Sequence, residues 1–274
     1  MKGIFNYIDR QSPIHRLTGA TKLICLILWS FAVMLSYDTR LLAFLAVMSI
    51  VLFKLSRIRI RDISFMLGFT AFFMVINNLL IFLFSPLHGV NIYGTKHVLA
   101  TIGSFEITKE QLFYHLNNVL KYMASIPVVL LFVCTTQPSE FAASLNRIGV
   151  KYTVAYAVAL ALRYIPDIQR EYHEISQAQQ ARGIEMSRKQ NIVRRLRSAG
   201  AILVPLILSS LDRIEIISNA MELRGFGKKK KRSWYMRRPF TKWDILVIIL
   251  SALLLVLALS LNAVNGSRFY NPFI

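Results

Sequence analysis

Acidic residues and cysteines are scarce in this sequence. Its 274 residues include 14 Asp and Glu against 33 Lys and Arg, and there are 2 cysteines. Cys25 and Cys134 both lie inside apolar segments, where a thiol behaves as a small hydrophobic side chain, so they indicate neither a disulfide nor a metal site. The five histidines show no metal-ligand spacing. We therefore expect no bound metal in this chain.

Catalytic motifs are also missing. The string GFGKKKK at 225–231 lacks both the spacing and the hydroxyl residue of the nucleotide-binding loop G-x-x-x-x-G-K-[ST]. The apolar segments contain no paired carboxylates, metal-ligand cluster or Ser/Lys pair, which argues against an intramembrane enzyme. They also lack the interior carboxylate of a proton-driven carrier. Any nucleotide hydrolysis would then belong to separate chains, and we expect no cofactor in this one.

Long apolar runs are the main feature that is present. Hydrophobic residues make up 55% of the chain, and the mean hydropathy is +0.48. The runs are Thr21–Tyr37, Leu41–Phe53, Phe65–Phe84, Leu112–Thr136 and Trp243–Leu261. Because roughly 20 apolar residues cross the hydrocarbon, the last three are long enough alone, whereas the first two must tilt or include flanking residues. We predict an all-α integral membrane protein with about five transmembrane helices.

The basic residues are unevenly distributed along the chain. If each run crosses once, the segments 1–22, 54–64 and 137–242 lie on one side and hold 28 of the 33 Lys and Arg. The positive-inside rule then places the amino terminus in the cytoplasm and the carboxyl terminus outside. We expect a membrane bundle of four spans at 1–136, a cytoplasmic domain of long amphipathic helices at 137–242, and the last span at 243–274. The first twenty residues are polar and charged throughout, so no removable signal peptide is expected.

A basic cluster at 228–232, with Arg237 and Arg238, lies just ahead of the last span. This position favours an anchor against anionic lipid headgroups, with a partner-docking patch as the alternative. No nucleic-acid recognition module accompanies the charge, so we expect no nucleic-acid partner.

The segment 137–242 opens with two helical patterns. The string PSEFAASLNRIG predicts a helix with Ser139 as its N-cap and Gly149 as its stop. The string KYTVAYAVALALRYIP is apolar over about 11 residues, too few to span a bilayer, and indicates a helix at the membrane edge or under the bundle. Its alanines form two pairs with a spacing of four, Ala155 with Ala159 and Ala157 with Ala161. They favour ordinary close packing, or else a surface for a partner membrane protein.

Two amphipathic patterns follow, and each leads to an arginine followed by a glycine. The first steps by threes and fours to Arg182 and Gly183 through Ile165, Ile168, Tyr172, Ile175 and Gln179. Its opposite face carries Asp167, Arg170, Glu171, Glu174 and Gln177. The second leads to Arg224 and Gly225 through Ile207, Leu211, Ile214, Ile217 and Met221. We predict two amphipathic helices that stop at these glycines, a linking helix over 188–197, and a break or kink at Pro205.

Polar residues in and between the spans suggest local contacts. Asn77, Asn78, Asn117 and Asn118 are expected to form hydrogen bonds between helices in preference to binding substrate. The loop 85–110 contains glycines and short alternating stretches, which allow a small β-hairpin.

The string QPSEFAASLNRIGVKYTVAYAVALALRYIPDIQREYHEISQAQQARG at 137–183 is the most specific signal. With MELRG ending at Gly225 and SPIHRL at 12–17, it resembles the transmembrane coupling (T) component of energy-coupling factor transporters. These are prokaryotic importers of vitamins and metal ions related to ABC transporters. The resemblance implies that Ala181, Arg182 and Gly183 form one ATPase-docking motif. Leu223, Arg224 and Gly225 resemble the second, with Leu where the family often has a small residue.

The resemblance also implies partners. Two ABC ATPase subunits, identical or paralogous, would bind ATP and Mg²⁺, and a substrate-binding (S) membrane subunit would carry the cargo through the cell membrane. The alanines at 155–161 are candidates for the contact with the S subunit. The alternative is a purely structural role, in which each arginine interacts only with the terminal carbonyls of its own helix. A self-contained secondary carrier is the competing function, and it would need a midplane ion-coupling group.

Overall fold

The computed structural model describes residues 10, 12–102, 105–184, 192–228, 234 and 238–273. The chain divides into two compact units, which we describe separately. The helix unit comprises 138–237, and the membrane unit comprises 2–137 with 238–274.

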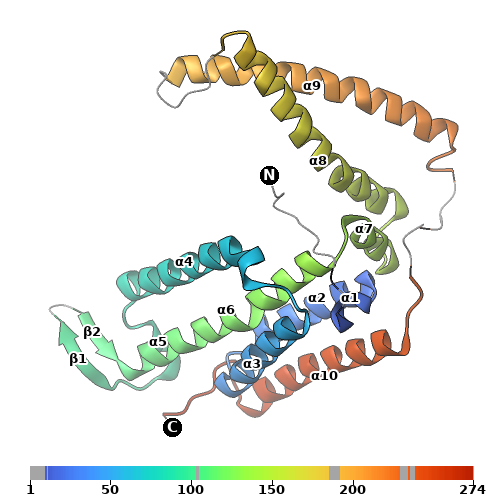
Figure 1. The fold of residues 1–274 in the computed structure, drawn as a ribbon. Coiled ribbons are helices and arrows are strands. Elements are labelled where there is room, and N and C mark those ends of the chain that lie inside the picture. The colour runs from blue at the N-terminus through green and yellow to red at the C-terminus, as the bar shows by residue number, and fades with distance from the viewer. Residues whose placement is uncertain are drawn as a thin grey trace. The chain divides into compact units, whose positions relative to one another are not determined.

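The membrane unit is built of helices with one small hairpin (Figure 1). Its helices are α1 (Pro13–Arg16), α2 (Gly19–Leu35), α3 (Thr39–Leu55), α4 (Ile60–Phe84), α5 (His88–Tyr93), α6 (Lys109–Thr135) and α10 (Lys242–Val264). Strands β1 (Val98–Ile102) and β2 (Phe105–Thr108) pair antiparallel, which confirms the predicted hairpin. The short helix α5 was not predicted.

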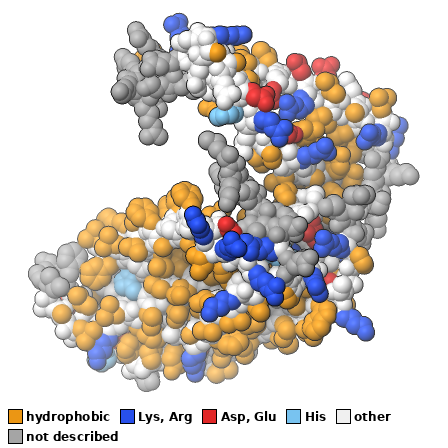
Figure 2. All heavy atoms as spheres, viewed as in Figure 1, with side chains coloured by type: hydrophobic (Ala, Val, Ile, Leu, Met, Phe, Trp, Pro, Cys, Tyr) orange, Lys and Arg blue, Asp and Glu red, His pale blue; other side chains and the backbone are white. Residues whose placement is uncertain are grey.

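All five apolar runs form helices, as predicted. Among the described residues, α4, α6 and α10 are each long and apolar enough to cross a membrane, whereas α2 is shorter. Helix α3, at 17 residues, has the length of α2. None of the most apolar stretch of α4 is buried within the chain. Hydrophobic side chains cover most of the visible face of this unit (Figure 2), as expected of a surface in contact with lipid.

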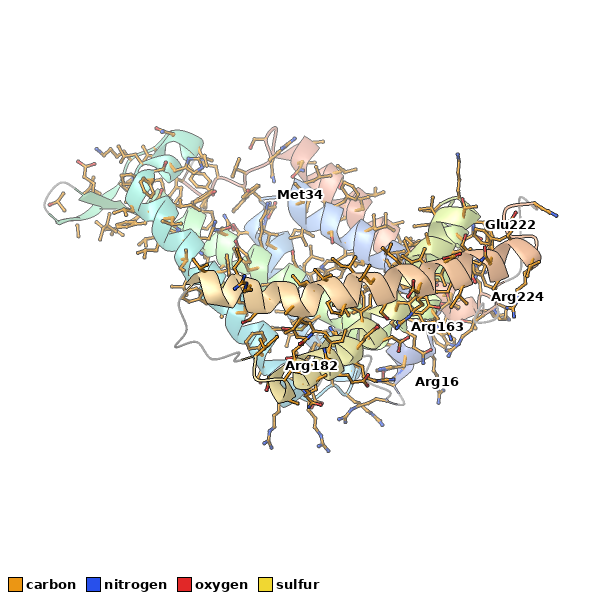
Figure 3. The ribbon with its side chains drawn as sticks, turned by 90° about the horizontal axis from the view of Figure 1, so that it is seen from above. Arg16, Met34, Arg163, Arg182, Glu222 and Arg224 are labelled. Carbon is orange, nitrogen blue, oxygen red and sulfur yellow. The ribbon has the colours of Figure 1, made fainter. Side chains whose placement is uncertain are left out.

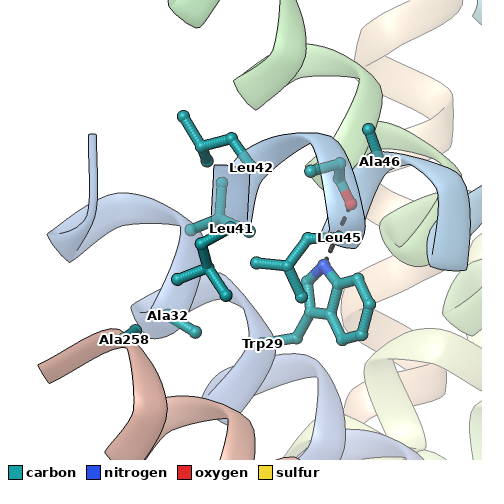
Figure 4. Close-up of a cluster of buried hydrophobic side chains, with 9 residues drawn as sticks. Trp29, Ala32, Leu41, Leu42, Leu45, Ala46 and Ala258 are labelled. Atoms are coloured by element: carbon teal, nitrogen blue, oxygen red, sulfur yellow. Dashed lines mark hydrogen bonds between the residues drawn. The ribbon is translucent and has the colours of Figure 1, made fainter. Parts of the chain in front are cut away.

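Small residues bring the helices of the membrane unit close together. The core is formed by α2, α3, α6 and α10 and includes Ala32, Ala46, Ala124 and Ala258, all almost fully buried. The indole nitrogen of Trp29 donates to the carbonyl oxygen of Ala124 at 2.9 Å (Figure 4). Because hydrocarbon offers no water, such a buried N–H group must find its partner inside the protein.

A single carboxylate joins the first turns of two helices. Asp244 closes a capping box with Thr241 at the start of α10, and its Oδ1 accepts the backbone N–H of Thr18 at 2.9 Å. Thr18 is the N-cap of α2, so one negative charge lies at two helix N-termini, where unpaired N–H groups and helix dipoles favour it.

The other ends of α2 and α10 are joined as well. Asn262 donates to the carbonyl oxygen of Leu35 at 3.1 Å, and Asn265 donates to the buried carboxylate of Asp38 at 2.9 Å. Burial acts to raise the pKa of Asp38, but hydrogen bonds from Arg40 and Asn265 outweigh it, so the pKa lies below its ordinary value. Helices α2 and α10 therefore run parallel.

Aromatic residues close the same end of the unit. The segment after α10 places Phe269 and Phe273 against the ring of Tyr93, and Asn271 donates to the carbonyl oxygen of Tyr93 at 3.0 Å. The backbone of Tyr37 donates to the carbonyl oxygen of Arg268 at 2.9 Å. The chain beyond α10 thus fastens the loop after α2 to α5.

The predicted hydrogen bonds between helices are confirmed in the membrane unit. Asn118 of α6 donates to the side-chain oxygens of Asn77 and Asn78 on α4, at 3.0 and 3.3 Å. Asn117 accepts a hydrogen bond from Thr39 of α3 at 2.7 Å.

The helix unit contains α7 (Pro138–Arg147), α8 (Tyr152–Ala181) and α9 (Ile192–Leu223). Several predictions for this unit need correction. Helix α7 begins at Pro138, so Ser139 is not its N-cap; proline fits the first helical position because its fixed φ is helical and it has no N–H to leave unpaired. The short apolar helix and the first amphipathic helix are one continuous helix, α8, which passes through Pro166.

Helix α9 passes in the same way through Pro205, which does not end it. Of the predicted linking helix, 188–191 lie outside the described residues, and 192–197 are the first turns of α9. A proline removes one backbone hydrogen-bond donor, but in both helices the turns before and after the proline remain helical.

The shared carboxylate gives a testable prediction for the membrane unit. Replacing Asp244→Ala should lower the thermal unfolding midpoint in mild detergent by roughly 5 °C, because two helix N-termini lose their acceptor. The matched control is Asp212→Ala, which removes an exposed carboxylate from α9. Equal midpoints for the two variants would contradict the shared role of Asp244.

Candidate functional site at the tips of the two long helices

Helix α8 ends in a glycine-dependent cap at Arg182. The N–H of Gly183 donates to the carbonyl oxygen of Gln180 at 2.9 Å, and the N–H of Ile184 donates to that of Gln179 at 3.0 Å. Gly183 has φ +84°, the left-handed conformation that this pattern requires. The sequence prediction that the helix stops at this glycine is confirmed.

Helix α9 ends with the same cap at Arg224. The N–H of Gly225 donates to the carbonyl oxygen of Glu222 at 2.8 Å, and the N–H of Phe226 donates to that of Met221 at 2.9 Å. Gly225 has φ +64°. Arg182 and Arg224 therefore hold the same position, the last residue before a left-handed glycine, and we call these two helix ends the tips.

The side chains of both tips are accessible. Ala181, Arg182 and Gly183 are all exposed, as are Leu223 and Arg224, whereas Gly225 is partly buried. Within the described residues the Arg182 side chain makes no hydrogen bond or ion pair, so it does not bind the carbonyls of its own helix. Arg224 does make further contacts within the chain. Leu223 is 90% exposed, although an apolar side chain of this size is more often buried.

Contacts between α8 and α9 show that the two helices run antiparallel. Gln179 donates to the carbonyl oxygen of Ala201 at 3.0 Å near the end of α8. Tyr156, near the start of α8, packs against Phe226 with the rings tilted and their centroids 4.9 Å apart. The tips therefore lie at opposite ends of the pair, as Figure 3 shows for Arg182 and Arg224.

The helix length sets the distance between the tips. The second tip lies level with Tyr156, and a helix rises 1.5 Å per residue, so Arg182 lies about 40 Å from it along α8. One side chain could not contact both ends, but two separate protein surfaces could each bind one tip.

Aromatic residues fix the second tip. Phe226 packs against Tyr152 and Tyr156, and the indole nitrogen of Trp234 donates to the side-chain oxygen of Asn146 in α7 at 3.1 Å. The sequence analysis missed this cluster because its members are up to 88 residues apart and follow no local period.

Apolar side chains are exposed along both helices between the tips. On α8 they include Val154, Ile165, Ile168 and Tyr172, and on α9 they include Leu203, Val204, Ile207, Leu208, Leu211 and Ile214. We call these residues the apolar band. Three members of each predicted amphipathic stripe are thus exposed, whereas Gln179 of the first stripe contacts α9. Glu171, predicted to lie on the polar face of α8, instead contacts α9.

A groove of about 550 Å³ lies between α8 and α9 on the half of the pair nearer Arg224. Its walls include Leu160, Tyr164, Ile217, Met221 and Phe226. Ala161 also lines it.

The four alanines of α8 do not share one environment. Ala155 is completely buried and Ala159 is partly buried, whereas Ala157 and Ala161 are exposed. The pair Ala155 and Ala159 therefore matches ordinary packing, and the pair Ala157 and Ala161 is open to a partner.

Comparison with known proteins places these features in a family. The family model described as cobalt transport protein matches residues 10–234. The energy-coupling factor transporter transmembrane protein EcfT of Thermosediminibacter oceani is 31% identical over 264 residues, which are 92% of this chain and 95% of the relative.

Two further relatives bear the same name. The protein of Streptococcus thermophilus is 29% identical over 254 residues, 90% of this chain and 93% of the relative. That of Bacillus subtilis is 27% identical over 269 residues, 95% of this chain and 98% of the relative. This chain therefore belongs to the cobalt transport protein family, together with the transmembrane proteins of energy-coupling factor transporters.

Proposed function

We propose that this chain is the coupling subunit of an importer for a vitamin or a metal ion. In this proposal two ATPase subunits bind the two tips, bind ATP and Mg²⁺, and hydrolyse ATP. A separate S membrane subunit holds the cargo. The observation that carries the proposal is the pair of identically capped, exposed arginine ends at opposite ends of one antiparallel helix pair.

The geometry of each tip suits a firm attachment to a moving partner. An arginine is always charged, and its planar guanidinium can bind a carboxylate through two parallel hydrogen bonds. The two cap hydrogen bonds hold the arginine backbone, while the glycine turns the chain away without a side chain that would obstruct a partner. When ATP changes the spacing of the ATPases, a helix held in this way has to follow.

The apolar band and the open alanines support a contact with the S subunit. Monomeric soluble proteins rarely expose large continuous apolar patches, so a band along two helices marks a surface that meets a membrane or another protein. Ala157 and Ala161 would let a helix of the S subunit approach the backbone of α8 closely. Movement of the helix pair would then be passed to the subunit that carries the cargo.

We place the chain in a prokaryotic cell membrane with its amino terminus in the cytoplasm. Two observations support this placement: the relatives are bacterial, and 28 of the 33 Lys and Arg fall on the side that then faces the cytoplasm. The tips lie in the segment assigned to that side, where ATP is available.

Charge reversal at both tips tests the proposal. The double variant Arg182→Glu, Arg224→Glu should reduce ATPase co-purification and substrate uptake more than about tenfold, because both charge-assisted attachments become repulsive. The control is Arg163→Glu, Arg170→Glu, which makes the same change of charge at two exposed arginines of α8 that lie between the tips. Unchanged co-purification and uptake in the tip variant would exclude the assigned role.

The glycine cap gives a milder test. Gly183→Ala should weaken ATPase binding several-fold, because a side chain at φ +84° is strained by about 1 kcal/mol even though a Cβ there would meet no neighbouring atom. Gly200→Ala is the control, since Gly200 lies inside α9 with equal space and without a left-handed backbone. Binding affinities measured on detergent-solubilised complexes should separate the two variants; equal affinities would mean that the cap geometry does not matter.

A further inference from the structure

A polar contact joins the middles of α8 and α9. Glu171 of α8 accepts a hydrogen bond from the hydroxyl of Ser209 on one carboxylate oxygen. Its other oxygen accepts from Nη2 of Arg213 at 2.6 Å. Ser209 and Arg213 are one turn apart on α9, so the carboxylate is held from two sides. The Glu171 side chain is only 16% exposed, which strengthens the contact relative to a surface ion pair.

Arg213 also extends the contact along α8. Its guanidinium lies over the ring of Tyr164, with 6.0 Å between the guanidinium carbon and the ring centroid. Tyr164 is two turns before Glu171 on α8, so one arginine contacts two levels of the facing helix.

Apolar packing around this contact is thin. From Tyr156 to Ala181, helix α8 buries only Ser176, and the described side chains of α9 that are buried are Ile202 and Leu206. On the half nearer Arg224 a groove separates the two helices. Apolar contacts of this extent tolerate sliding, because one exposed apolar residue can replace another.

The polar contact does not tolerate sliding. If α9 slipped by one turn, either Pro205 or Ile217 would come level with Glu171, depending on the direction of the slip. One of the two hydrogen-bond donors would then be lost, because neither of these side chains can donate a hydrogen bond. A buried carboxylate that loses a partner is costly, and polar groups of this kind are known to fix the register of paired helices. A one-turn slip would also move one tip by about 5.4 Å relative to the other.

We propose that Glu171 is a positioning residue that, with Ser209 and Arg213, fixes the register of α8 against α9 and thereby the separation of the two tips. The inference rests on the proposed function, because the register matters for transport only if both tips are attached to ATPases. A displacement imposed at one tip reaches the other only when the helices cannot slide past each other.

Charge reversal of the contact tests this inference in the full complex. The variants are Glu171→Arg, Arg213→Glu, and the double swap that combines both substitutions and so restores a pair of opposite charges. Glu174→Arg is the matched control, since it reverses an exposed carboxylate three residues further along α8. Glu171→Gln and Ser209→Ala are the milder variants if a reversal prevents folding.

Three measurements are needed for each variant. Spin labels at Gln177→Cys and Asn219→Cys, both exposed, report the separation of the helix ends when Cys25 and Cys134 are replaced by Ala. Substrate uptake per ATP hydrolysed reports coupling, and co-purification of the ATPases reports assembly.

We expect the single reversals to broaden the distance distribution or shift it by about 5 Å, and to lower uptake per ATP roughly tenfold with the ATPases still bound. The double swap should recover both. Unchanged distances and uptake in the single reversals, or no recovery in the double swap, would overturn the inference. Retained ATPase binding in the Arg182 and Arg224 double variant would instead overturn the proposed function, so the two failures can be told apart.

Discussion

The unpaired backbone groups at helix ends are the constraint on which this structure depends. Every helix leaves N–H groups free at its start and carbonyl groups free at its end, and a bilayer supplies no water to satisfy them. In the membrane unit, Asp244 satisfies the starts of two helices, and Asn262 binds a carbonyl at the end of α2. In the helix unit, two glycines satisfy the ends of α8 and α9 and leave an arginine accessible at each. The same requirement thus fastens the bundle and shapes the proposed docking tips.

The two long helices combine a rigid backbone with little burial. Local hydrogen bonds form the cap at each tip, aromatic packing around Phe226 also holds the second tip, and the band between the tips remains exposed. In the proposed function the helix pair binds several partners. The caps at the two tips would keep their shape whichever partner covers the apolar band. The polar contact at Glu171 then determines how the two tips are related.

Features that depend on local sequence were predicted well, and features that depend on distant contacts were not. The apolar runs indicated all five long helices of the membrane unit, and the glycines at 183 and 225 marked the ends of α8 and α9. The proline at 205 was misleading, because the sequence shows the lost donor but not the turns that preserve the helix. The hydrogen bond from Thr18 to Asp244 joins residues that are 226 positions apart, so no periodic pattern in the sequence indicates it. Helical periodicity placed Glu171 on the face opposite the apolar stripe, but it could not show which face of α8 meets α9.

The continuity of α9 also limits how this chain can change in evolution. Each residue of an α-helix advances the direction of its side chains by about 100°, so one inserted or deleted residue within Ile192–Leu223 would turn Arg224 to a different direction and move it along the axis. Changes in length are therefore expected in the connection between the helices and not inside them. Homologous chains should keep the number of residues in α9 constant even where its sequence varies.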